Sequence, residues 1–174
     1  CSCYKELCRS EALNELDRSS GSASCSFDNF DLSYYTDNGA SDGTNPRRKM
    51  QNYYNFCINY AKDFSMNSPS IIMMGKTGLG KTHLSLSIAK EVVSGGSGVV
   101  YAPAQKLVSN LEREHFSYSG ETEKRDAVLD CDLLVIDDLG TEFLTPFISS
   151  QLHNIIETRI NRQKATIINT NLTL

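Results

Sequence analysis

The sequence predicts an α/β fold in which helices pack on both faces of a parallel β-sheet. Three observations favour this class. Short apolar runs, typical of buried strands, alternate with longer stretches of helical periodicity. A glycine-rich turn separates the first apolar run from the helical stretch after it, and two adjacent aspartates close a later run. In such sheets, ligands bind at the carboxyl ends of the strands, so the same pattern places a candidate site.

The elements are expected in the following order. Pro46 suits the first turn of a helix, and apolar residues recur at helical spacing from Met50 to Phe64. Strands are expected at 70–74, 99–101, 133–136 and 166–168, with helices at 81–93, 103–113, 121–130 and 147–162. Residues 47–174 would form one domain, as a chain of 174 residues usually does.

Two segments precede this domain. Residues 1–18 combine several cysteines with a short helical pattern, and residues 19–46 have the serine, glycine and aspartate composition of a linker. The linker also carries four aromatic residues within nine positions, namely Phe27, Phe30, Tyr34 and Tyr35. Since linkers rarely carry so many large aromatic side chains, this segment is expected to dock elsewhere on the protein.

Composition narrows the function classes. The chain has 17 Lys and Arg against 21 Asp and Glu, a net charge of −4, which argues against nucleic-acid binding over the whole surface. Short basic runs at 47–49 and 124–125 are candidates for local DNA contacts, although such runs usually face solvent. The apolar runs are far shorter than the roughly 20 residues that span a bilayer. No secretory leader opens the chain, so we expect a cytoplasmic protein without a membrane partner.

Residues 75–82 match the phosphate-binding loop pattern at every fixed position, between an expected strand and an expected helix. Their glycines permit turns closed to other residues, so that amides at the start of the helix converge on phosphate oxygens. Lys81 would lie between the β- and γ-phosphates, and the Thr82 hydroxyl would bind Mg²⁺. A glycine-rich turn without a ligand is the alternative. The expected nucleotide-binding residues are Gly75, Thr77, Gly78, Leu79, Gly80, Lys81, Thr82 and His83.

Polar side chains also close the third and fourth expected strands. Asp137 is expected to hold Mg²⁺ with Thr82, and Asp138 to orient and polarise the attacking water. A strand that ends in a solvated acidic turn is the alternative. Asn171 is expected to lie between the γ-phosphate and the water, with Asn169 as the second choice. The expected catalytic residues are therefore Lys81, Asp138 and Asn171.

Together these motifs resemble the AAA+ ATPases, a class of P-loop NTPases. The strings that carry the resemblance are the phosphate loop, 136–140 and 166–172. Within that class the sequence is similar to the DnaC-type bacterial replicative helicase loaders, through the less specific strings 1–5, 29–35 and 140–142. The resemblance extends over nearly the whole chain.

The resemblance implies a bacterial ATP-hydrolysing DNA replication protein that helps to place the replicative helicase on single-stranded DNA. ATP or ADP with Mg²⁺ would be bound, and the ATP-bound form would be a homo-oligomer. Residues 1–18 would be the remnant of a helicase-binding region with a Zn²⁺ site, in which Cys1 and Cys3 form the second cysteine pair; reduced thiols without metal are the alternative. Phe27 or Phe30 would contact the nucleotide base, or else dock on the core.

Members of this class continue past the position of Asn171 with an arginine finger, a fifth strand and a helical lid. None of these is found before Leu174, so the expected fold is incomplete at its C-terminus and weak ATPase activity is expected. Arg159 and Arg162 do not match the finger's position. Three other functions stay open: a transposition helper ATPase of the same superfamily, a nucleotide-binding fragment without activity, and a P-loop kinase, which the tandem aspartates disfavour.

Overall fold

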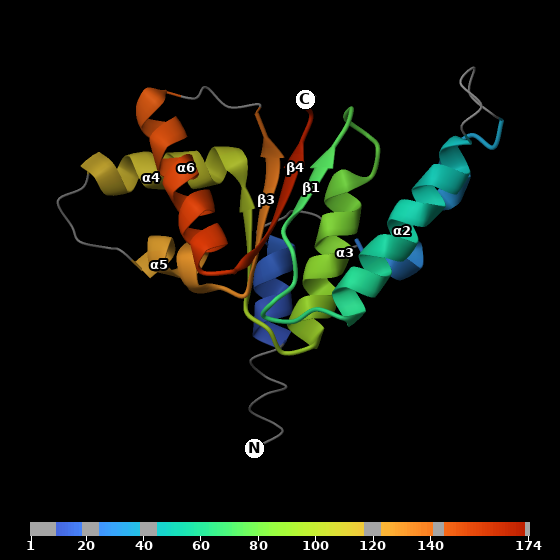
Figure 1. Ribbon diagram of the computed structural model, residues 1–174, viewed down its shortest axis with the longest axis horizontal. Coiled ribbons are helices and arrows are strands. Elements are labelled where there is room, and N and C mark those ends of the chain that lie inside the picture. The colour runs from blue at the N-terminus through green and yellow to red at the C-terminus, as the bar shows by residue number, and fades with distance from the viewer. Residues whose placement is uncertain (1–9, 19–24, 39–44, 117–122, 141–144, 173–174) are drawn as a thin grey trace.

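The computed structural model describes residues 10–18, 25–38, 45–116, 123–140 and 145–172. Within these ranges the chain forms a four-stranded parallel sheet of order β1-β4-β3-β2. The strands are β1 (Ile71–Met74), β2 (Val99–Pro103), β3 (Leu133–Leu139) and β4 (Ala165–Thr170). Helices lie on both sides of the sheet (Figure 1), which confirms the predicted three-layer α/β/α arrangement.

One outer layer consists of three helices: α2 (Pro46–Lys62), α3 (Lys81–Ser94) and a further helix over residues 10–18. The helix α2 begins at the predicted proline, and Asn45 caps it by accepting a hydrogen bond from the backbone N–H of Arg48 at 3.0 Å. Leu16, from the helix over 10–18, is buried in the core of this layer. The same core includes Cys57, Tyr60, Leu84, Leu86, Ile88, Tyr101, Val135 and Ile167.

The opposite layer consists of α4 (Ala104–Phe116), α5 (Glu123–Asp130) and α6 (Pro146–Asn161). Because side chains alternate across a strand, Leu134 and Ile136 of β3 face this layer, whereas Leu133, Val135 and Asp137 face α3. The observed bounds of α2 to α6 confirm the predicted helices, with ends that differ by a few residues.

Arg159 of α6 ties this second layer to the sheet. Its side chain is completely buried, at 0% exposure, and its Nε donates to Thr166 Oγ1 at 3.0 Å. Its two terminal nitrogens donate to backbone carbonyl oxygens at the end of α5 and the start of β4, those of Val128, Leu129, Cys131 and Ala165. A single guanidinium therefore joins three elements.

The strand β3 is longer than the sequence predicted. It continues through Asp137 and Asp138 to Leu139 rather than ending at Ile136. Its pairing with β4 is irregular between Ile136 and Leu139, and Asp138 adopts a left-handed backbone with φ +60°. Aspartate is among the few non-glycine residues that take this conformation readily. Adjacent residues of a strand point to opposite faces, and here Asp137 is buried whereas Asp138 is exposed.

The linker aromatics dock on the rest of the protein, as predicted, with one exception, and α2 is their main partner. Two short 3₁₀ helices, Phe27–Asn29 and Leu32–Tyr34, contain Phe27 and Tyr34, and Phe30 and Tyr35 are the C-cap residues that follow them. Phe30 stacks on Tyr54 of α2, with ring centroids 5.5 Å apart, and also on Tyr35, while the edge of Phe27 meets Tyr54. Tyr34 is the exception, because it is 85% exposed. We call Phe27, Phe30, Tyr35 and Tyr54 the aromatic cluster.

Two further predictions concern a zinc site and membrane-spanning helices. The cysteines assigned to zinc, Cys1 and Cys3, lie outside the described residues. Inside the described ranges there is no group of three or more histidine, cysteine or acidic side chains placed to hold a metal ion. In that same part of the chain, every helix is too short or too polar to cross a membrane.

Candidate active site

The phosphate loop connects β1 to α3 and opens into a cavity of about 420 Å³. Gly80 is the N-cap of α3, with φ +82°. Because glycine has no side chain to cap the helix, the first-turn N–H groups remain available to an anion. The cavity is lined by Thr77, Gly78, Gly80, Lys81, Thr82, His83, Asp137, Asp138, Asn169 and Asn171. The fold thus brings together residues of the loop, β3 and β4 that the sequence had assigned to one site.

Lys81 lies at the centre of this arrangement. Its Nζ donates to the carbonyl oxygens of Gly75 and Lys76 at 2.7 and 3.0 Å, and to Asn171 Oδ1 at 2.8 Å. These three contacts use all the donors of an ammonium group. A phosphate oxygen in the loop would replace one of these acceptors.

Asn171 bridges Lys81 and Asp138. Its Nδ2 donates to Asp138 Oδ1 at 2.8 Å while its Oδ1 accepts from Lys81. The partners determine the orientation of the amide, because an ammonium only donates and a carboxylate only accepts. All three predicted catalytic residues are therefore in one hydrogen-bonded chain.

Asp137 is held by three donors. Thr82 Oγ1 lies 3.0 and 3.1 Å from its two oxygens, Asn169 Nδ2 lies 2.6 Å from Oδ1, and the Tyr101 hydroxyl donates to Oδ2. Asp137 is 7% exposed. Burial, and then the hydrogen bond to Asp137, raise the pKa of Tyr101 far above its ordinary value, so its hydroxyl keeps its proton.

The donor set at this position fits Mg²⁺. The groups are a hydroxyl and a carboxylate, and hard divalent cations prefer oxygen ligands. The buried Oδ1 of Asn169, beside them, has no hydrogen-bond partner in the described part of the chain. Thr82 and Asp137 are thus the residues that would hold the ion.

The aromatic cluster packs directly against the phosphate loop. The Tyr35 hydroxyl donates to the carbonyl oxygen of Leu79 at 3.2 Å, and the Phe30 ring meets His83 edge-on at 5.1 Å. The Nε2 of His83 lies 2.8 Å from the carbonyl oxygen of Ser26, so this nitrogen carries the proton. Phe27 and Phe30 therefore dock on the core, and contact with the nucleotide base stays a prediction.

We expect Gly80→Ala to destabilise the protein more than Gly78→Ala does. Both glycines have φ near +80°, a backbone that costs other residues roughly 1–3 kcal/mol. A Cβ at Gly80 would also lie 2.8 Å from the Tyr35 hydroxyl and 2.9 Å from the Phe30 ring, whereas one at Gly78 has nothing within 4 Å. Thermal unfolding of both variants measures the difference. Equal losses would contradict the close packing of the aromatic cluster on the loop.

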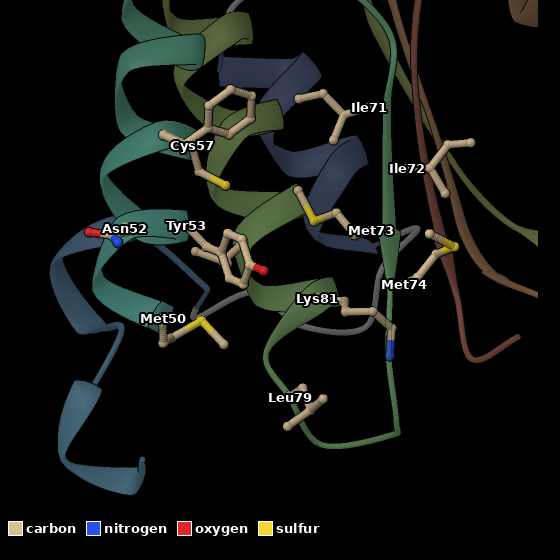
Figure 2. Close-up of a pocket in the computed structure, with 12 residues that line it drawn as sticks. Met50, Asn52, Tyr53, Cys57, Ile71, Ile72, Met73, Met74, Leu79 and Lys81 are labelled. Atoms are coloured by element: carbon tan, nitrogen blue, oxygen red, sulfur yellow. The ribbon is translucent and has the colours of Figure 1, made fainter. Parts of the chain in front are cut away.

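A second, apolar groove of about 550 Å³ adjoins the site on the other side of Lys81. In Figure 2, the α2 residues Met50, Tyr53 and Cys57 line one side of this groove and β1 forms the opposite side. Leu79 and Lys81 lie at the end of the groove nearest the phosphate loop. Leu79, predicted to bind nucleotide, lines this groove rather than the phosphate cavity, and Gly75 lines neither. On β1, Ile72 and Met74 are exposed.

Comparison with known proteins identifies the family of this chain. A family model described as IstB-like ATP binding protein matches residues 57–174. The chain belongs to the IstB-like ATP-binding family. The chain is 27% identical to the replicative helicase loader DnaC of Buchnera aphidicola subsp. Acyrthosiphon pisum, over 85% of this chain and 56% of that protein. It is 29% identical to DnaC of Escherichia coli strain K12, over 64% and 46% respectively.

Another relative is a putative ATP-binding protein of insertion sequence IS5376 from Geobacillus stearothermophilus, 33% identical over 52% of this chain and 36% of that protein. The chain spans about half the length of the DnaC relatives it matches. Among solved structures it is similar to the DnaC helicase loader, with a TM-score of 0.66 and 25% identity over 85% of this chain and 80% of that one. It also resembles AMPPCP-bound DnaA from Aquifex aeolicus, with a TM-score of 0.59 and 23% identity over 70% and 38%.

These comparisons confirm the predicted AAA+ P-loop fold and the resemblance to DnaC-type loaders. The roles of the individual site residues in this IstB-like protein remain predictions. Sequence reasoning missed Tyr101, Ser85 and Tyr35, which lie in or against the site. No motif marks them, since each reaches the site through a contact between segments distant in the sequence.

Proposed function

We propose that this chain is the ATP-binding and ATP-hydrolysing core of a helicase loader. The observation that carries the proposal is the convergence of Lys81, Asp137, Asp138 and Asn171 on one cavity at the carboxyl ends of β1, β3 and β4. This is the position at which open α/β sheets bind ligands.

In the proposed reaction the loop binds the phosphates of ATP. Backbone N–H groups at the start of α3 and the Lys81 ammonium hold the phosphate oxygens. Thr82 and Asp137 would hold Mg²⁺, which when bound neutralises developing phosphate charge. The ribose and base would extend from this cavity.

Asp138 would act on the attacking water. Its carboxylate is exposed at the cavity and accepts from Asn171; because a carboxylate has several acceptor sites, it can also accept from a water molecule and orient it. Asn171 touches both Lys81 and Asp138. Asn171 would therefore couple the position of the γ-phosphate, bound by Lys81, to the position of the water, bound by Asp138.

The biological partners are proposed from the relatives. Curated relatives over most of this chain are named replicative helicase loader DnaC, so we propose a replicative helicase and single-stranded DNA as partners, an ATP-bound homo-oligomer, and the bacterial cytoplasm as its location. Of the basic residues at 47–49, Arg47 binds the linker through Asp37 and the Tyr35 carbonyl. Arg48 and Lys49 are exposed and are the better candidates for DNA contact.

A second candidate function is that of a transposition helper ATPase, which the insertion-sequence relative favours. The two functions differ in partner and not in nucleotide chemistry. ATP-dependent co-elution with a replicative helicase on size-exclusion chromatography would support the loader. ATP-dependent co-elution with a transposase, and not with the helicase, would support the second function.

The nucleotide site itself is tested by Lys81→Ala. Loss of the ammonium removes a charge-assisted contact to phosphate worth about 1.5–3 kcal/mol, so the affinity for a fluorescent ADP analogue should fall roughly tenfold to a hundredfold. Lys76→Ala, which removes the same charge from a variable position of the same loop, is the matched control and should bind like the wild type. Equal affinities for the wild type and Lys81→Ala would refute the assignment.

A further inference from the structure

Tyr101 and Asn169 lie on either side of Asp137, on the two strands that flank β3. Tyr101 is on β2 and Asn169 is on β4, and β3 pairs with both strands. Each donates a hydrogen bond to a different oxygen of the Asp137 carboxylate, Tyr101 to Oδ2 and Asn169 to Oδ1. Contacts from both neighbouring strands thus hold one side chain at the end of the sheet.

The sheet geometry makes these contacts possible. Tyr101 is opposite Val135 in the register of β2 and β3, so its long side chain lies on the same face as Asp137 and reaches the diagonal neighbour two residues further on. Asn169 reaches Asp137 where the pairing of β3 and β4 is irregular, between Ile136 and Leu139. Both contacts therefore depend on the register of the finished sheet.

The same contacts restrict rotation of the carboxylate. Asp137 is almost fully buried, and its two oxygens have fixed donors on both sides. The Nδ2 of Asn169 is itself within 2.7 Å of Ser85 Oγ, and Ser85 Oγ donates to the carbonyl oxygen of Thr82. With the carboxylate held in this way, Thr82 Oγ1, beside the phosphate loop, contacts both of its oxygens.

We propose that Tyr101 and Asn169 are positioning residues that hold the Asp137 carboxylate in the orientation in which, together with Thr82, it binds the Mg²⁺ of a bound nucleotide. This inference rests on the proposed function, since it concerns how the same site binds its metal. Tyr101 is not among the residues that line the phosphate cavity, and Asn169, which is, would act through its hydrogen bond to Asp137. Their effect would be confined to the part of nucleotide affinity that Mg²⁺ contributes, because groups that orient a metal ligand tune metal affinity through that ligand.

Tyr101→Phe tests the proposal, because it removes one hydroxyl and leaves the buried ring. A fluorescent ADP analogue is titrated into the wild type and the variant, first with EDTA and then over a range of Mg²⁺ concentrations. We expect unchanged affinity in EDTA and a Mg²⁺ midpoint raised roughly tenfold. Tyr60→Phe is the matched control, since the Tyr60 hydroxyl is also in the core but donates to the Pro69 carbonyl, far from Asp137. It should leave both values unchanged.

Asn169→Ser provides a second, independent variant, and thermal unfolding of each protein shows that it is folded at the assay temperature. A raised Mg²⁺ midpoint in either folded variant, with EDTA affinity intact, supports the proposal. A wild-type Mg²⁺ midpoint in the folded variants overturns it, and so does an equal loss of affinity with and without Mg²⁺, which would indicate a merely structural role. If the wild type binds no nucleotide under either condition, the proposed function fails as well, and that result differs from both of the others.

Discussion

Asp138→Asn is expected to reduce ATP turnover by roughly 10²–10⁴-fold while ATP binding persists. The carboxylate that would orient and polarise the water loses its charge, whereas Lys81, Thr82 and Asp137 are unchanged. The backbone should tolerate the substitution, because asparagine accepts the left-handed conformation that Asp138 adopts at φ +60°. Phosphate release and equilibrium nucleotide binding are measured on the same preparation.

Asp132→Asn is the matched control. Asp132 precedes β3 at the end of the strand opposite to Asp138, where it accepts from Lys164 at 3.0 Å and from the backbone N–H of Gly98 at 2.9 Å. The same chemical change there should leave turnover close to the wild-type rate. Turnover of Asp138→Asn at the wild-type rate would show that another group orients the water.

Arg159→Met is expected to have the largest effect on stability, lowering the free energy of unfolding by about 3–5 kcal/mol, because several buried acceptors each lose a hydrogen bond whose loss costs about 1–3 kcal/mol. Methionine can fill much of the space but donates no hydrogen bonds. The carbonyl oxygens of Val128, Cys131 and Ala165 would lose the guanidinium that now binds them, and a buried acceptor without a partner is costly. Urea denaturation measures the change.

Arg162→Met provides the comparison for that variant. Arg162 follows α6 and pairs with Asp130 at 2.7 Å, with both side chains more than half exposed. Exposed pairs of this kind contribute no more than about 1 kcal/mol. If the two variants unfold at the same urea concentration, the buried hydrogen bonds of Arg159 contribute no more than a surface pair.

Local pattern predicted the elements and the loop, because those depend on neighbours in the chain. Pro46 begins α2, and Gly80 and Lys81 mark the start of α3, as expected. The C-terminal end of β3 could not be predicted in the same way. A run of apolar residues ends at Ile136, but pairing with β4 continues the strand to Leu139.

The environment of the acidic pair also required the tertiary structure. Adjacent aspartates look alike in a sequence, and only the continuation of β3 beyond Ile136 shows which of the two faces α3 and is buried, Asp137, and which is exposed, Asp138. Tyr101 appeared as one apolar residue of a short strand, and its contact with Asp137 depends on the register of β2 and β3. Arg159 appeared as an ordinary residue of an amphipathic helix, yet it is fully buried.

The position of β1 beside β4 has a consequence for biosynthesis. The two strands meet across 96 residues of sequence, as the bond from the Thr166 N–H to Ser70 Oγ shows. At ribosomal speeds of about 5–20 residues per second, β1 leaves the ribosome roughly 5–20 s before its partner. Lys81 and Asn171, 90 residues apart, meet only after that pairing. The pocket for the phosphates therefore cannot be complete in a nascent chain until β4 has left the ribosome, and nucleotide retention would report that synthesis has passed β4.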